Sequence, residues 1–242
     1  MKNRTQLLPD VYLTSVQTDK FKTGCFSLNL LRPLRKEEAA MNALLPSVLL
    51  RGSETYPDIR SISARLDELY GASMGTLIRK KGEVQFVGFY ADYLEDAFAG
   101  EPVFGQMADF VSEILLHPAL SDGAFGREAV EGEKWNLANA IESRINDKRS
   151  YAVSQLLKTM CQGEIYGVPR LGELEDLEKA DEKSLYRHYR ELLEHSQLEL
   201  FYMGRKSPGE VRETFLRVLS GLPRGQAPDR HEGRADGGGG PA

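Results

Sequence analysis

The feature that most constrains the fold is the return of a strand pattern after a long helical tract. Segments 11–16, 24–32, 74–79 and 84–90 have the apolar patterns of strands with a packed face. Helical patterns fill most of residues 94–194, and the strand-like segment LELFYM then follows at 198–203. A lone late strand must pair with earlier ones. The order therefore predicts an α+β fold, with a mixed, largely antiparallel sheet and helices packed on one face.

Local signals indicate where several elements begin and end. Residues 80–82 contain a glycine and form a turn between two strands of a hairpin. Residues 37–50 form an apolar helix, in which Pro46 removes one backbone hydrogen bond and should produce a kink. Asp58 begins the next helix, and Gly71 stands where a C-terminal glycine is expected.

The last twenty residues differ from the rest of the chain. Residues 223–242 contain six glycines and three prolines, and no large apolar side chain that would gain from burial. We therefore expect one folded domain over residues 1–222, followed by a disordered Gly/Pro-rich tail over residues 223–242.

Charge and cysteine content exclude several classes of function. The net charge is −5 and the isoelectric point is about 5.5, so the chain lacks the positive field that collects nucleic acid or anionic lipid. Its two cysteines are too few for a disulfide framework. We see neither the apolar core of a signal peptide nor an apolar run long enough to span a membrane. These features predict a cytoplasmic protein without nucleic-acid or membrane partners.

The residue patterns alone indicate no catalytic site. The four histidines are not spaced as metal ligands, and surface positions are expected for them, including His188 and His195. The nucleophile-elbow, dinucleotide-binding and P-loop motifs do not occur. Cys25 lies within a predicted strand and is interpreted as a small buried apolar residue.

Longer phrases do point to a known family. They are LLRGSETYPD at 49–58, ISARLDELYGAS at 62–73, the segment 125–152 beginning FGREAVEGEKW, and the segment 163–204 beginning GEIYGVPRLG. Together these phrases resemble one domain of the insulinase/pitrilysin family of zinc metallopeptidases. The resemblance is strongest to a bacterial branch associated with 5-aminopentanol modification of translation elongation factor P. Members of that branch have two homologous domains, and the chain is similar to the first.

The resemblance also implies where a zinc site would lie. Active members carry the inverted motif His-x-x-Glu-His, and its ligand and base positions fall on Ala43, Pro46 and Ser47. The third ligand, a glutamate in active members, falls on Ala140, whereas an accessory glutamate is retained as Glu133. Alanine, proline and serine supply neither the imidazoles nor the carboxylates that hold zinc and activate water. We therefore expect no catalytic residue, no bound metal and no cofactor.

The resemblance implies a catalytically inactive subunit. Such a subunit would form a heterodimer with an active insulinase-family metallopeptidase and help to enclose a peptide or protein substrate. Two alternatives stay open: an active zinc metalloendopeptidase whose ligands lie elsewhere, and a non-proteolytic scaffold with the same fold.

Active relatives extend their substrate as an added strand beside one sheet edge. The corresponding segment of this chain predicts peptide contacts for Ser73, Met74, Gly75, Thr76 and Leu77. The alternative is an ordinary edge strand that Lys80 and Lys81 protect from aggregation.

Overall fold

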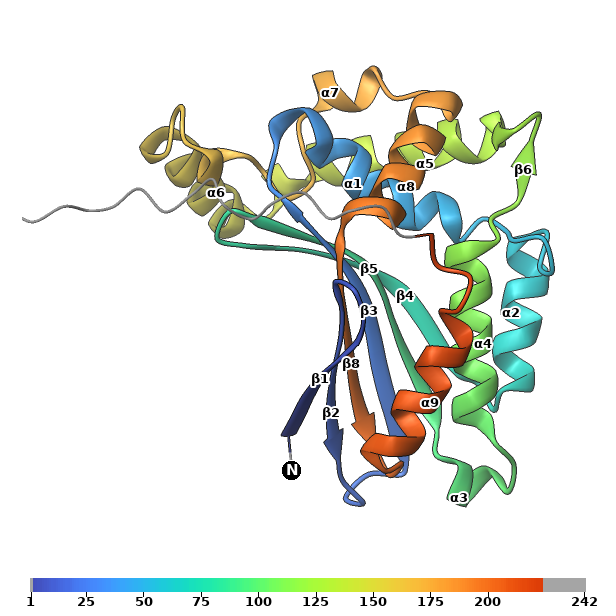
Figure 1. The fold of residues 1–242 in the computed structure, drawn as a ribbon. Helices are drawn as coiled ribbons and strands as arrows, with labels where there is room; N and C mark the ends of the chain where they lie inside the picture. Colours follow the sequence, from blue (N-terminus) through green and yellow to red (C-terminus); the bar gives the residue numbers. More distant parts are fainter. Residues whose placement is uncertain (1, 224–242) are drawn as a thin grey trace, which may run out of the picture.

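The computed structural model describes residues 2–223 and confirms the predicted α+β class (Figure 1). A six-stranded sheet has the order β1-β2-β8-β3-β5-β4. The late strand β8 lies inside this sheet, parallel to β2 and antiparallel to β3. The remaining neighbours are antiparallel. The strands are β1 (Lys2–Leu8), β2 (Val11–Gln17), β3 (Thr23–Pro33), β4 (Ser73–Lys81), β5 (Val84–Leu94) and β8 (Gln197–Gly204), with a small separate hairpin of β6 (Leu120–Ser121) and β7 (Ala124–Phe125).

The helices form two groups that cover one face and one end of the sheet (Figure 1). Helices α4 and α9 pack along the sheet, with α2 outside α4, while α1, α5, α7 and α8 gather at one end and α6 projects away from them. The helices are α1 (Lys36–Leu49), α2 (Ile59–Glu68), α3 (Asp96–Ala99), α4 (Val103–Leu116), α5 (Arg127–Glu142), α6 (Lys148–Met160), α7 (Leu174–Glu178), α8 (Glu182–His195) and α9 (Pro208–Val218), with short 3-10 turns η1 (Ser143–Asn146) and η2 (Ile165–Gly167).

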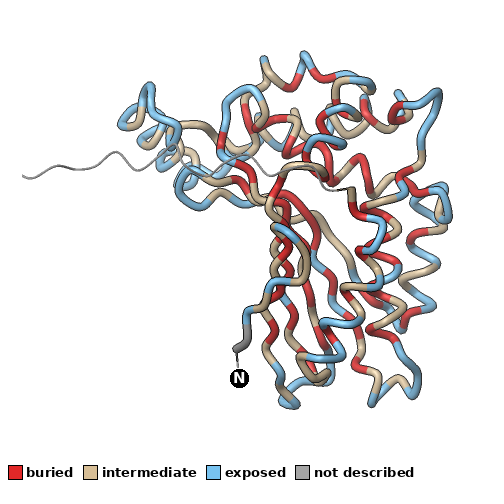
Figure 2. The backbone as a smooth tube through the Cα atoms, viewed as in Figure 1, coloured by how far each residue is buried: buried red, intermediate tan, exposed pale blue. Residues whose placement is uncertain are grey.

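The main core lies between the sheet and helices α4 and α9. Burial alternates along β3, where Phe26, Leu28 and Leu30 are each only 2% exposed, and Figure 2 shows the buried segments along this layer. Edge-to-face contacts join Phe26 to Phe104 of α4 and to Phe215 of α9. These two helices and the alternate strand residues therefore bury one continuous apolar layer.

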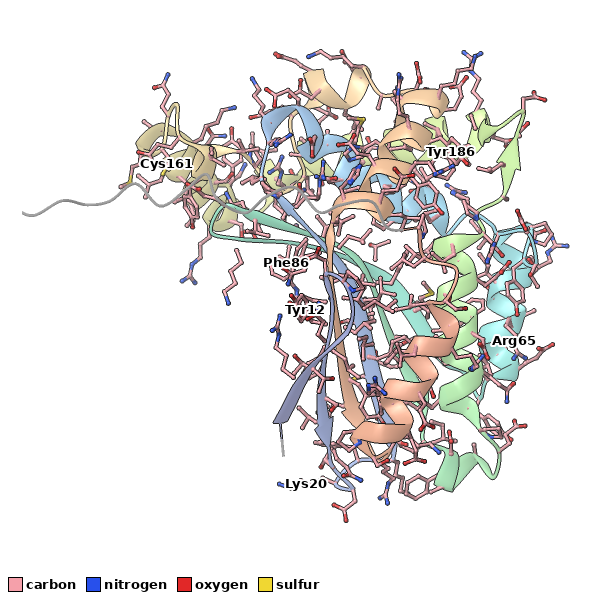
Figure 3. The ribbon with its side chains drawn as sticks, in the orientation of Figure 1. Tyr12, Lys20, Arg65, Phe86, Cys161 and Tyr186 are labelled. Atoms are coloured by element: carbon pink, nitrogen blue, oxygen red, sulfur yellow. The ribbon has the colours of Figure 1, made fainter. Side chains whose placement is uncertain are left out.

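The opposite face of the sheet is open. Tyr90 and Phe201 are 42% and 37% exposed there, although both belong to strands in the interior of the sheet. Figure 3 places Tyr12 and Phe86 on this same side, away from α4 and α9. The prediction of helices on one face is thus confirmed, and the free face is available to line a site.

Several local predictions need correction. Strand β1 (Lys2–Leu8) was not predicted, because its polar residues KNRTQ show no packed face. The helical tract predicted from residue 94 is broken at Gly100, whose φ of +80° ends α3 before α4 begins. Helix α1 runs through Pro46 to Leu49, and the kink expected at this proline stays a prediction.

Two further expectations concern the ends of the chain and membranes. The predicted tail, 223–242, lies outside the described residues apart from Pro223. Within residues 2–223, none of the helices has the length and apolar character that crossing a membrane would require.

Candidate functional site

The three positions that would carry zinc ligands face one cavity. Ala43 and Ser47 are one helical turn apart on α1, and Ala140 lies on α5, which packs against α1. All three line a cavity of about 1070 Å³, together with Leu137 of α5. The structure therefore brings together positions that are almost a hundred residues apart in the sequence.

The side chains at these positions do not fit a metal ion. Two alanines supply no ligating atom, and a lone serine hydroxyl is a poor ligand for zinc. Across residues 2–223, no three His, Cys, Asp or Glu side chains are placed to hold a metal ion together. Ala43, Ser47 and Ala140 therefore cannot form a zinc site in this cavity with the side chains they have.

Glu133, the retained carboxylate, has another partner. Its Oε1 accepts a hydrogen bond from Nε of Arg51 at 2.5 Å, and Asn136 donates to Oε2 at 3.2 Å. Arg51 follows α1, so this ion pair ties the end of α1 to α5. Glu133 is not among the residues that line the cavity. Its geometry supports a structural role.

The rest of the cavity is made by the open sheet face and by strand β4. Cys25, Ser27 and Asn29 of β3 line it, with Tyr90 of β5 and Phe201 of β8. Cys25 is only partly buried, which corrects its interpretation as a buried residue. Burial, followed by the negative charges of nearby carboxylates, raises the pKa of its thiol. This environment is the opposite of one that activates a cysteine nucleophile.

Strand β4 is an edge of the sheet, as the predicted peptide-binding segment requires. Of the five predicted contact residues, Thr76 and Leu77 line the cavity, whereas Ser73, Met74 and Gly75 continue the edge beyond it. The Tyr90 ring lies over Gly75, where an added Cβ would come within 2.6 Å of the ring.

The hairpin register determines which backbone groups of β4 are free. Lys81 pairs with Val84 across a two-residue turn that has Gly82 at a φ of +59°, so these two residues form a hydrogen-bonded pair. Hydrogen-bonded and non-hydrogen-bonded pairs alternate in an antiparallel ladder. The N–H and C=O groups of Met74 and Thr76 therefore face outward from the sheet edge.

A loop covers the remainder of this edge. Arg170 donates from Nη1 to the carbonyl of Ile78 at 2.8 Å. The Lys80 ammonium donates to the carbonyls of Tyr166 and Val168 at 2.8 and 2.9 Å, and it lies 4.5 Å from the centre of the Tyr166 ring. No local sequence pattern indicates these contacts, because they join segments far apart in the chain. The edge is therefore covered from Ile78 onward and open over Ser73–Leu77.

A buried polar network fixes the elements around the cavity. Gln85, fully buried in β5, donates to the carbonyl oxygens of Ala39 and Arg170 at 3.2 and 2.8 Å. Asn42 of α1 donates to Oε1 of Gln85 at 2.8 Å, and its Oδ1 lies 2.7 Å from Nε2 of His188. The Asn42 oxygen is an acceptor, so Nε2 of His188 carries the hydrogen in this arrangement. The expectation of a surface position for His188 is wrong, because this side chain is only 5% exposed.

His188 should make stability depend on pH. Burial lowers the pKa of His188 below its ordinary value of 6.5. The negative charges of Glu38 and Glu191 raise this pKa, and the positive charge of Arg32 lowers it further. As pH falls, His188 therefore takes up a proton in the unfolded chain before it does so in the folded chain. The free energy of unfolding decreases as pH drops below about 6.5.

We expect His188→Gln to reduce this loss of stability. Glutamine retains a donor toward Asn42 but does not titrate. Urea unfolding at about pH 7.5 and about pH 5.5 should show a smaller decrease in the free energy of unfolding for the variant than for the wild type. Equal decreases in both proteins would contradict the assignment of a neutral, buried His188.

Comparisons with known proteins identify relatives of this chain. No family model matches the chain. It is 31% identical over 202 residues to the probable inactive metalloprotease YmfF of Bacillus subtilis (strain 168). The matched stretch covers 83% of this chain and 47% of that protein. The chain thus spans about half the length of this curated relative.

Solved structures show the same fold. A conserved protein from Enterococcus faecalis V583 matches with a TM-score of 0.85 and 29% identity, over 92% of this chain and 53% of that one. The peptidase M16 inactive domain from Pseudomonas fluorescens matches with a TM-score of 0.73 and 13% identity, over 95% of this chain and 53% of that one. Pitrilysin matches with a TM-score of 0.65 and 14% identity, over 94% of this chain and 24% of pitrilysin.

Proposed function

Because the chain is a homologue of the insulinase/pitrilysin (M16) metallopeptidases, with a curated relative that is a probable inactive metalloprotease, we propose that it is itself catalytically inactive. One observation carries this proposal: Ala43, Ser47 and Ala140 line the same cavity without supplying a zinc ligand set. Pro46 also leaves no carboxylate at the position of the general base. The chain would bind a substrate without cleaving it.

The proposed role is that of a noncatalytic partner. In this role the chain is an inactive subunit that pairs with an active insulinase-family metallopeptidase in a cytoplasmic heterodimer. Its cavity and open sheet face would form part of the enclosure for a peptide or protein substrate. The family branch suggested by the sequence further supports a link to modification of elongation factor P.

Co-expression tests the partner role against the scaffold alternative. The chain would be produced with an active insulinase-family metallopeptidase from the same genome, and the mixture would be separated by size-exclusion chromatography. We expect one complex that contains both chains, and peptide cleavage that decreases when the chain is left out. Separate elution, with cleavage unaffected by the chain, would favour a non-proteolytic scaffold.

Peptide binding at the β4 edge gives a more local prediction. Thr76→Pro removes an outward N–H that an added peptide strand would use, and proline is tolerated where an edge residue faces solvent. The test uses a labelled peptide that alternates threonine and glutamine. We expect its affinity to fall about tenfold, because one hydrogen bond is lost and the proline ring hinders the approach of a peptide strand. Fluorescence anisotropy measures this change.

Thr76→Val is the matched control. Valine retains the backbone N–H and nearly the shape of threonine, so its affinity should stay close to that of the wild type. Equal binding by the proline and valine variants would show that the peptide does not add to this edge.

A further inference from the structure

The cavity is strongly polarised in charge. Four cations line it, namely Arg79, Lys80, Lys81 and Arg170, whereas Asp92 is the only carboxylate among its lining residues. This excess contrasts with the net charge of −5 for the whole chain. A local positive field of this kind attracts a negatively charged ligand to one place rather than to the whole surface.

The cations lie at one end of the cavity. Arg79, Lys80 and Lys81 belong to the end of β4 next to the hairpin turn, and the Arg170 guanidinium is bonded to Ile78 nearby. Asp92 pairs with Ser73 at the opposite end of β4. Ser73 and Arg79 are six residues apart, which corresponds to about 20 Å of extended chain. The hairpin end of the cavity is therefore positive and the far end is not.

These positive charges are not neutralised by carboxylates. Lys80 and Arg170 donate to backbone carbonyls, which leave their charges uncompensated. Arg79 and Lys81 are exposed, and within the described part of the chain their side chains make no hydrogen bond or ion pair, since these residues bond only through their backbone in the β4–β5 ladder. Burial lowers the pKa of Arg170, and the positive charge of nearby Arg144 lowers it further. A ligand carboxylate here would meet several cations that have no anionic partner.

Resting on the proposed role in peptide binding, we propose that the cavity selects extended peptide segments with acidic side chains. The free edge of β4 would hold the peptide backbone, and the acidic side chains would lie at the hairpin end beside Arg79, Lys81 and Arg170. Apolar lining residues such as Leu77, Phe86 and Tyr90 would contact the remaining side chains. This combination of a free strand edge, apolar walls and unpaired cations fits a peptide better than a nucleic acid, whose bases need stacking platforms along a continuous basic groove.

Three labelled peptides of equal length test the inference by fluorescence anisotropy with the 242-residue chain. They alternate threonine with glutamate, with glutamine or with lysine. We expect the glutamate peptide to bind about tenfold more tightly than the glutamine peptide, and the lysine peptide to bind most weakly. Added salt should reduce the difference, since these cations are partly exposed.

Variants locate the selectivity. Arg79→Gln combined with Lys81→Gln should remove most of the preference for the glutamate peptide over the glutamine peptide. Arg212→Gln removes an exposed arginine of α9 that does not line this cavity, and it should leave the preference intact.

The outcomes separate this inference from the proposed function. Binding of all three peptides with equal affinity, or a glutamate preference that survives the double variant, would overturn the selection of acidic segments while leaving peptide binding intact. A single-stranded oligonucleotide that binds more tightly than the glutamate peptide would also overturn it. Failure of every peptide to bind would contradict the proposed function itself.

Discussion

A variant that carries Ala43→His, Ser47→His and Ala140→Glu is expected to bind one zinc ion, with a Kd of about 1 μM or lower. The two histidines would lie one turn apart on α1, and the glutamate would face them from α5 across the same cavity. An imidazole pair and a carboxylate with an open fourth position are the ligand set of catalytic zinc sites. Isothermal titration calorimetry with zinc measures the gain.

The single variant Ala43→His is the control for this experiment. One imidazole cannot hold zinc at that affinity, so its binding should be far weaker. A triple variant that keeps the wild-type circular dichroism spectrum and yet binds no zinc would show that the three side chains do not converge. Peptide cleavage is not expected from the triple variant, because Pro46 is buried in α1 and supplies no general base.

Gly88→Ala should cause the largest loss of stability, about 4 kcal/mol or more. Gly88 lies in β5 between Asn29 of β3 and Leu77 of β4. An added Cβ would come within 1.9 Å of the Leu28 carbonyl oxygen, a backbone atom that no change of rotamer can move away. A decrease in Tm of roughly 10 °C, measured by scanning calorimetry, corresponds to this loss in a chain of this size.

Gly105→Ala provides the comparison. Gly105 lies in helix α4, and an added Cβ there meets no atom within 4 Å. Alanine favours a helix over glycine by about 1 kcal/mol, so this variant should be slightly more stable than the wild type. Similar Tm values for the two variants would contradict the close approach of β3 to Gly88.

The fold was largely predictable because its central strands have clear periodicity. Strand β3 alternates buried and less buried residues as its sequence indicated, and the late strand β8 joined the sheet for lack of any other partner. Strand β1 gave no such signal, since an edge strand with polar residues on both faces looks like a loop. The short helix α7 has too few residues to show a period.

The site was predictable only in part. The resemblance to a family gave the positions of Ala43, Ser47 and Ala140, which the fold brings to one cavity. The hydrogen bond between Arg170 and Ile78 joins residues 92 positions apart, and the contact between His188 and Asn42 joins residues 146 positions apart. No local sequence pattern encodes such contacts. Asn42 and Gln85 are polar residues at core positions, so periodicity alone would assign them to the surface.

The zinc content of the purified wild-type chain tests the central claim most directly. Elemental analysis should find no stoichiometric zinc, and a peptidase assay with and without a chelator should find no cleavage in either case, because Ala43, Ser47 and Ala140 supply no ligand set. One zinc ion per chain, together with cleavage that the chelator abolishes, would contradict an inactive subunit and establish a working metallopeptidase with ligands elsewhere.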